Sequence, residues 1–449
     1  MNIIVFSSFA QEAPGNAPHP SSRLDAYISD AVHRNQAISR QHFQLEKSMH
    51  ALEEAKGFFM PQASLLANYT KAGGGRTIDL PLGDLMNPVY STLNELTGSQ
   101  KFPQLSNESI LLNPDNFYDA KLRTSLPLIN TEIWYAKKIR QEDITRQQAT
   151  LNVYKRQLVK DVKTAYYQYF QATRAVEVYY NALQLVQEII RVNESMLRNG
   201  VRNSTSLTRA QTELQRVEAS IAQAKNQQRN ARSYFNFLLN RPLADSILPD
   251  STIIAIPSAI AATGIQQREE LQQLETAKRM ALLVEKKEQS LFTPKVSTFL
   301  DLGTQGFNWN FDNKTRYYLW GVTLQWDLFT GGQRKQRIYQ ARADASMAQT
   351  AYDETWQGLQ LELDRAGNNY RSAVSNFTIA QQQLQLSEKY FRDQMKVYRE
   401  GQLLYIELLD AQNQLTQSRL QLLQAWAQVQ VSAADIERAQ ASYPLPDHE

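Results

Sequence analysis

The chain carries one sequence pattern twice, once in each half. In residues 200–214 and again in residues 401–415, a glycine is followed by Leu seven positions later and then by Ala-Gln-x-x-Leu. The segment Leu-Pro-Leu-Ile at 126–129 likewise matches Trp-Asp-Leu-Phe at 326–329. The chain is therefore an internal duplication, and a duplicated unit constrains the architecture more than any single motif does.

Composition favours long helices over ordinary globular domains. The 449 residues include only 17 Gly and 15 Pro, and the stretches between them are rich in Gln, Ala, Leu, Arg and Glu, which are good helix formers. The net charge is +3 and basic residues alternate with acidic ones, so no nucleic-acid partner is expected. No cysteine is present, which excludes disulfides and thiolate chemistry. No apolar run is long enough for a transmembrane helix, so a membrane would be crossed only by strands.

Four segments are expected to form such strands, at residues 60–71, 117–130, 294–305 and 315–330. The second places Asp119, Lys121 and Arg123 on one face, while its other face is mostly apolar. The last has an equally regular apolar face, with Leu319 as the exception on the other side. Strict alternation over about ten residues fits a strand between lipid and water, and the apolar faces are aromatic near their ends.

Four long helices are expected at residues 132–199, 204–240, 333–400 and 404–440. The longest would extend about 100 Å, so it needs coiled-coil partners along its length. Heptads are visible after each glycine of the duplicated pattern. In the second copy the large residues of the seam are Leu408, Leu415, Leu422 and Val429, and in the first they are Leu207, Leu214, Ile221 and Phe235.

The remaining segments complete two repeats, residues 22–240 and 265–440. Shorter helices are expected to open them, at 22–57 and 265–290. The other expected parts are a remnant signal peptide (1–10), an extended lead-in (11–21), an irregular insertion with four prolines (73–116), a linker or equatorial segment (241–264) and a tail (441–449).

Motifs for catalysis are not apparent. The five histidines lack ligand spacing, so no metal site is expected. The run Gly73-Gly74-Gly75-Arg76 lacks the Walker spacing and is interpreted as a flexible loop. No nucleophile stands beside a base, so we expect neither an enzyme nor a cofactor.

Closure of the strands requires several copies of the chain. Four strands cannot close a membrane barrel, because the smallest such barrels use eight, and an open sheet edge is prohibitive in lipid. Two, three or four copies would give eight, twelve or sixteen strands, with the coiled coils closing into a helical tube below. The alternative is a non-transport structural coiled-coil protein of the cell envelope, which explains the heptads but not the strand faces.

The duplicated Gly-x₆-Leu-x₂-Ala-Gln-x₂-Leu segments, the strand end at 126–128 and the run Trp-Asp-Leu-Phe-Thr-Gly-Gly at 326–332 resemble those of the TolC family of outer-membrane efflux proteins. The resemblance spans residues 22–440. It implies an α+β membrane protein: a homotrimer whose 12-stranded transmembrane β-barrel is continuous with a long periplasmic α-helical coiled-coil barrel. It also implies an exit duct in the cell outer membrane, contacting outer-membrane lipid, for a tripartite efflux pump or type I secretion system. The implied partners are a periplasmic adaptor (membrane fusion) protein and an inner-membrane pump.

The same resemblance implies the roles of residues at the two glycine turns. Those that would contact the adaptor are Gly200, Ser204, Leu207, Gly401, Leu404 and Leu408. Family members close the gate with a tyrosine before the second glycine and an arginine after it. Tyr398 fits the tyrosine, but position 403 is Leu, so Arg202 of the first turn is the candidate for the arginine.

Two carboxylates complete the expected gate. Glu407 and Asp410 lie one helical turn apart and so share a face. By resemblance they line the narrowest point of the tunnel, where rings of carboxylates favour cations. The alternative is that both are solvated turn residues. The first repeat has Ser206 and Arg209 at the matching positions, so the fold itself does not demand the charge.

Overall fold

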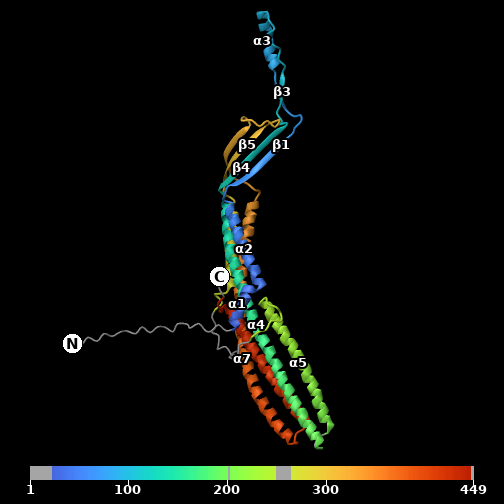
Figure 1. Cartoon of the computed structure of the whole chain (residues 1–449). Coiled ribbons are helices and arrows are strands. Elements are labelled where there is room, and N and C mark those ends of the chain that lie inside the picture. The colour runs from blue at the N-terminus through green and yellow to red at the C-terminus, as the bar shows by residue number, and fades with distance from the viewer. Residues whose placement is uncertain (1–22, 201–202, 249–263, 446–449) are drawn as a thin grey trace, which may run out of the picture. The chain divides into compact units, whose positions relative to one another are not determined.

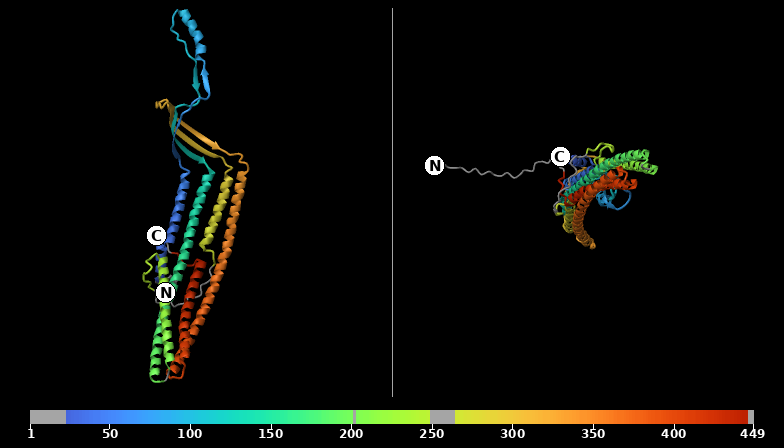
Figure 2. Two further views of the ribbon diagram at one scale, coloured as in Figure 1. Left: turned by 90° about the vertical axis from the view of Figure 1, so that its right-hand side faces the viewer. Right: turned by 90° about the horizontal axis from the view of Figure 1, so that it is seen from below.

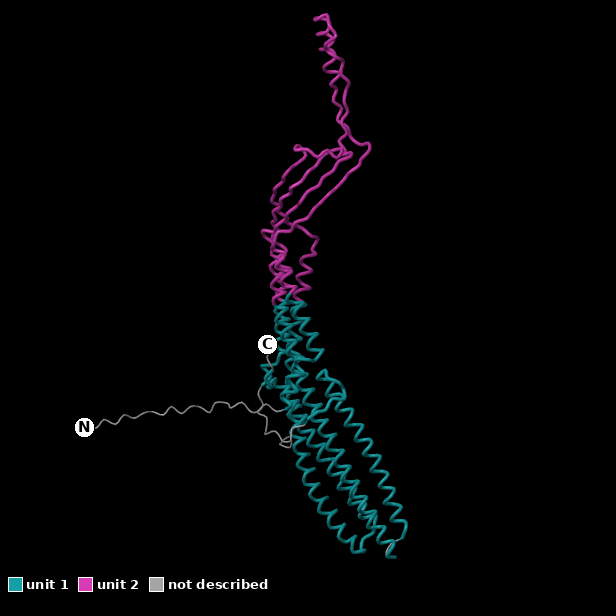
Figure 3. The backbone as a smooth tube through the Cα atoms, viewed as in Figure 1, with its two compact units in different colours: residues 1–49, 142–281, 344–449 teal, residues 50–141, 282–343 magenta. Residues whose placement is uncertain are grey.

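The computed structural model describes residues 23–200, 203–248 and 264–445. The expected signal remnant, the lead-in and most of the linker lie outside these ranges, as does Arg202. The chain divides into two compact units, which Figure 3 distinguishes by colour. One comprises residues 1–49, 142–281 and 344–449, and the other comprises residues 50–141 and 282–343. Each unit is considered by itself below.

The second unit is built around a four-stranded antiparallel sheet with strand order β1-β4-β5-β6 (Figure 1). Its strands are β1 (Gln62–Thr70), β4 (Phe117–Ile129), β5 (Lys295–Phe307) and β6 (Arg316–Gln325). At one end of this sheet the chain enters β1 and β5 from helices and leaves β4 and β6 into helices. The opposite end carries the insertion after β1 and the loop after β5.

The strand register aligns the two faces across all four strands. Leu65, Leu122, Leu302 and Tyr318 are successive partners across the sheet, and Leu300 pairs with Trp320 on the same face. The opposite face aligns the charged residues of β4 with Asp301 and Tyr317. The alternation in the sequence therefore places an apolar and a polar face correctly, because successive side chains of a strand point to opposite sides.

The expectation of an irregular insertion at residues 73–116 is wrong. The insertion forms a two-stranded ribbon of β2 (Thr77–Leu80) and β3 (Glu108–Leu111), with helix α3 (Leu82–Thr97) between them. The prolines do not prevent this helix, because Pro81 stands at its N-cap and Pro88 in its first half. It ends at Gly98, whose φ of 58° is the left-handed conformation that commonly terminates a helix.

An aromatic cluster covers one end of the sheet's apolar face. Tyr118 lies on this face, and only 3% of it is exposed. The ring of Trp309 stacks on both Tyr118 and Tyr69, and Phe311 packs beside Tyr118. The Tyr118 hydroxyl also donates to the carbonyl of Asn310 at 2.5 Å. The loop after β5 therefore folds back over the strand ends.

The helices belong mainly to the first unit, and none within the described parts of the chain has both the length and the hydrophobicity needed to cross a membrane. The short ones are α1 (Arg23–Arg34), α2 (Gln36–Gly57) and α6 (Glu269–Ser290). Two hairpins are formed by α4 (Thr131–Arg198) with α5 (Ser204–Leu238), and by α7 (Gln333–Arg399) with α8 (Tyr405–Gln440). Their turns lie side by side (Figure 2).

Alanines and large residues alternate where these helices pack, as the heptads predict. Along α8 the buried residues include Leu408, Ala411, Leu415 and Val429. The largest apolar cluster joins α1, α4 and the end of α5 around Tyr166 and Phe235.

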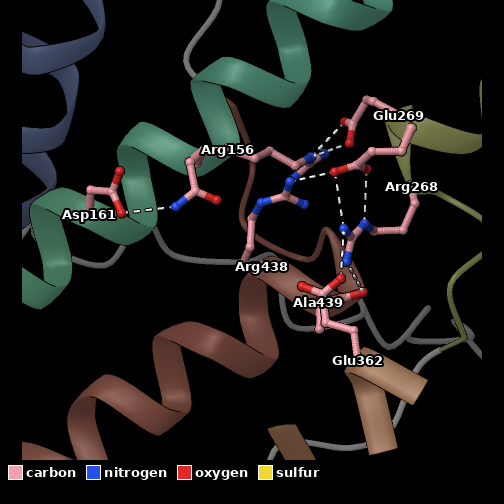
Figure 4. Close-up of polar contacts among 9 residues, drawn as sticks. Arg156, Asp161, Arg268, Glu269, Glu362, Arg438 and Ala439 are labelled. Atoms are coloured by element: carbon pink, nitrogen blue, oxygen red, sulfur yellow. Dashed lines mark hydrogen bonds and ion pairs between the residues drawn. The ribbon is translucent and has the colours of Figure 1, made fainter. Parts of the chain in front are cut away.

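A network of buried charges ties the start of α6 to α4 and α8 (Figure 4). The Arg156 Nε donates to both carboxylate oxygens of Glu269 at 2.6 Å. Arg268, only 3% exposed, donates to Glu270 at 2.9 and 3.0 Å and to the carbonyl of Ala439. Arg438 is the second partner of Glu270. The network joins the second repeat's opening helix to a helix of the first repeat.

Glu270 is the acceptor for two of these arginines. Burial acts to raise the pKa of this carboxyl, but the hydrogen bonds from Arg268 and Arg438 outweigh it and lower the pKa to about 2. A depressed pKa in the folded state stabilises the protein above the ordinary value of 4.5, and this contribution is lost as the pH falls toward 2.

We predict that Glu270→Gln destabilises the protein by about 3–5 kcal/mol at neutral pH, because two buried arginines lose their carboxylate. Glu362→Gln is the control, since that residue is half exposed and lies 3.3 Å from Arg268. Thermal unfolding should show a large loss for the first variant only. The difference in stability between Glu270→Gln and the wild type should become smaller below pH 4.5, where the wild-type carboxylate loses its stabilising contribution. Equal losses in both variants, or a gap independent of pH, would contradict the assignment.

Candidate gate site at the helical tip

Both hairpins of the first unit turn at a glycine, and the backbone there explains why. Gly200 has φ of 72° and Gly401 has φ of 80°, a region that other residues rarely adopt. The amide of Gly401 donates to the carbonyl of Tyr398, and the amide of Gln402 donates to that of Val397. Each glycine thus ends a helix of more than sixty residues (α4 has 68 and α7 has 67) and permits the turn into the next one.

A small apolar core holds the two turns together. Ile189 of α4, Ala210 of α5, Tyr398 of α7, and Tyr405 and Leu408 of α8 are all buried in one cluster. Each of the four long helices contributes, so the two hairpins pack against each other here within a single chain. Leu408, predicted to contact an adaptor, is completely buried in this core.

One hydrogen bond crosses the core between the hairpins. The Tyr398 hydroxyl donates to Asn193 Oδ1 at 2.5 Å, and both side chains are almost completely buried. The Asn193 amide in turn donates to the carbonyl of Ile189 at 3.0 Å. Tyr398 and Asn193 therefore link α7 to α4, and breaking this link would leave a buried polar group without its partner.

A second tyrosine in the core lacks such a link. The hydroxyl of Tyr405 is buried and finds no hydrogen-bond partner among the described residues. Burial, reinforced by the nearby charge of Glu213, raises the pKa of this phenol. Its ring lies 6.3 Å from that of Tyr398, so the two phenols share one environment but differ in their hydrogen bonding.

The predicted acidic pair lies on the opposite side of α8 from this core. Glu407 and Asp410 are exposed, and neither carboxylate has a hydrogen bond or ion pair within the described part of the chain. The structure therefore brings these two residues together on one surface. It does not bring them to Tyr398, which is inside the core.

The other predicted tip residues occupy the turn surface. Ser204 begins α5 and is exposed, Leu207 is half-buried, and Leu404 is the N-cap of α8 with 60% of its side chain exposed. Arg202 lies outside the described residues.

A polar contact missed in the sequence also joins the hairpins. Arg216 of α5 donates to Glu213 at 2.8 Å and to Asn413 Oδ1 of α8 at 2.6 Å. The carboxylate of Glu213 is buried beneath it. Sequence signals for such residues are weak, although Asn193 does stand at an otherwise apolar seam position, seven residues before the first glycine.

The polar face of the sheet in the second unit forms a separate charged surface. Arg123 binds Asp301 through two hydrogen bonds of 2.7 and 2.6 Å, and Lys121 and Tyr317 both donate to Asp119. Asp301 is only 1% exposed, so its charge is fully paired. Among the described residues, no group of three or more His, Asp or Glu side chains is placed to hold a metal ion.

Comparison with known proteins identifies the family. The model of the outer membrane efflux protein family matches residues 27–241 and 264–442, which is most of the chain. The chain therefore belongs to this family, which confirms the resemblance seen in the sequence. No curated protein matches the chain.

Solved channel structures share the fold at low sequence identity. CusC, described as forming a transmembrane channel, has a TM-score of 0.77 at 16% identity, covering 96% of this chain and 95% of that one. The outer membrane protein VceC from Vibrio cholerae has a TM-score of 0.72 at 15% sequence identity, covering 93% of this chain and 96% of that one. The open-state outer membrane channel MtrE from Neisseria gonorrhoeae has a TM-score of 0.73 at 17% sequence identity, covering 93% of this chain and 89% of that one.

The two tyrosines allow a matched test of the hairpin link. Tyr398→Phe removes the bond to Asn193 and leaves a buried amide oxygen unpaired, so we expect local stability at the tip to fall by about 1–3 kcal/mol. Tyr405→Phe removes only a hydroxyl without a partner, so we expect no loss. Hydrogen exchange of tip amides measures both. Similar exchange rates in the two variants would refute the link.

Proposed function

We propose that this protein is the exit duct of a tripartite efflux pump or type I secretion system in the outer membrane. The observation that carries the proposal is the four-stranded sheet, which has one apolar and one charged face and two edge strands without neighbours among the described residues. Membership of the efflux family and the fold of known channels support the same function.

The edges of the sheet argue for an oligomer, and the family resemblance specifies a trimer. β1 and β6 each present a row of backbone groups that lipid cannot satisfy, so each must pair with another copy of the chain. Three copies give a closed barrel of twelve strands, which is among the sizes known for membrane barrels. The exposed apolar residues Leu65, Trp320 and Leu324 would then face lipid.

The charged face would line the lumen. Arg123 is 40% exposed while its partner Asp301 is buried, so the surface presented to the lumen is polar but largely neutralised. Such a wall suits the passage of diverse solutes, because it offers neither an apolar binding surface nor a strong field of one sign.

The helical tip would be the periplasmic end. There the duct would meet a periplasmic adaptor and, through it, an inner-membrane pump. The exposed turn residues Ser204 and Leu404 are placed to contact such a partner, whereas Leu408 would support the turn from inside. The link between Tyr398 and Asn193 would hold the second hairpin against the first in the closed gate.

Native mass spectrometry in detergent tests the assembly. We expect a mass of three chains, stable at low protein concentration, because closure satisfies the edges of every sheet. A stable monomer that is folded and resists aggregation in detergent would contradict the proposal.

Single-channel recording tests the gate residues. In a trimer, Glu407 and Asp410 would form two rings of three carboxylates, which favour cations and bind multivalent ones. Glu407→Ala/Asp410→Ala should therefore reduce cation selectivity and relieve block by trivalent cations. Glu218→Ala is the control, since this exposed carboxylate lies on α5, away from the second turn. Unchanged selectivity and block in the double variant would remove the pair from the gate.

A further inference from the structure

The insertion between β1 and β4 holds itself together through asparagine side chains. The amide group of Asn87 donates to the carbonyl of Leu105 and accepts from its backbone amide, at 2.9 and 2.7 Å. Asn94 makes the same pair of bonds with Phe102, at 2.7 and 3.0 Å. Asn87 and Asn94 lie seven residues apart on α3, so the returning chain follows one face of the helix.

The opposite face of α3 is an uncovered apolar seam. Leu82, Val89 and Leu96 recur every seven residues, and Leu85 falls three residues after the first of them. Leu85 is 65% exposed, Val89 is 50% and Leu96 is 78%. Leucine and valine at this spacing form the pattern by which helices associate side by side.

The charges of α3 do not oppose association with identical helices. Asp84 and Glu95 are its only charged residues, and Asp84 is occupied by Asn107, which donates to it at 2.9 Å. Neither lies at an a or d position when Leu82 is taken as position a. A self-associating seam therefore has no like charges facing each other.

The root of the insertion adjoins the edge strand β1. β1, the edge strand that must pair with another copy, leads into β2 after only a few residues. That connection is bonded to the returning chain, because Ala72 donates to Asp115, Asn113 to the carbonyl of Gly74, and Leu112 to that of Arg76. In each copy of the chain, α3 therefore follows the edge strand that would pair with the neighbouring copy.

We propose that the α3 helices of the copies in one assembly pack against each other through the seam formed by Leu82, Leu85, Val89 and Leu96. The partner of this surface is therefore another copy of the chain. This inference rests on the proposed trimer, in which three identical helices would form a bundle beyond the loop end of the barrel.

Single cysteines test the seam, because the chain has none of its own. Val89→Cys places a thiol in the seam. Ser91→Cys is the control, because Ser91 is exposed but lies beside the returning chain, where its hydroxyl accepts a hydrogen bond from Gln104 at 3.1 Å. On mild oxidation of the purified full-length protein, we expect disulfide-linked dimers of the Val89→Cys variant at a yield about ten-fold above the control. Leu85→Cys provides a second reporter on the seam.

Several outcomes would overturn the inference. They are equal alkylation rates at positions 89 and 91 without disulfides, disulfides that join differently tagged assemblies, and protection of position 89 on cells but not in the purified protein. The last would identify a cell-surface component as the occupant. Native mass measured on the same samples separates the two proposals: a trimer with an accessible seam refutes only this inference, whereas a monomer refutes the proposed function.

Discussion

The backbone groups along β1 and β6 are the constraint on which the rest of the structure depends. A strand edge in lipid leaves amides and carbonyls without partners, and each such group costs about 2–7 kcal/mol. In the duct proposed above, the four strands of the main sheet therefore have to find their outer neighbours in other copies of the chain. Duplication suits this need, because two similar repeats give each chain two strand pairs and two helical hairpins in one continuous segment.

The two units are held together by different interactions. In the sheet, hydrogen bonds between strands fix the register, and the side chains only divide into an apolar and a charged face. In the helical unit the backbone is satisfied within each helix, so side chains decide the packing. Small and large residues alternate along the seams, and polar contacts such as Tyr398 with Asn193 and Arg268 with Glu270 join specific helices.

Sequence patterns predicted what depends on local periodicity. Alternation gave the faces of the sheet, and the two glycines marked the turns because each requires positive φ. The prediction for the insertion was wrong because its prolines lie where a helix tolerates them. In addition, the hydrogen bonds of Asn87 and Asn94 depend on a returning segment of the chain that no local sequence pattern reveals. For the same reason Asn193 was missed, since its partner lies 205 residues away in the sequence.

The most direct test of the account joins the two edges of the sheet. One cysteine at Leu66 of β1 is combined in turn with one at Tyr317, Leu319 or Gly321 of β6, all on the charged face. The account predicts that one of these registers gives a covalent ring of three chains on oxidation, because every β1 then meets the β6 of its neighbour. The account would be contradicted if none of the three cysteine pairs links one chain to another. It would also be contradicted if the linked products contain more than three chains.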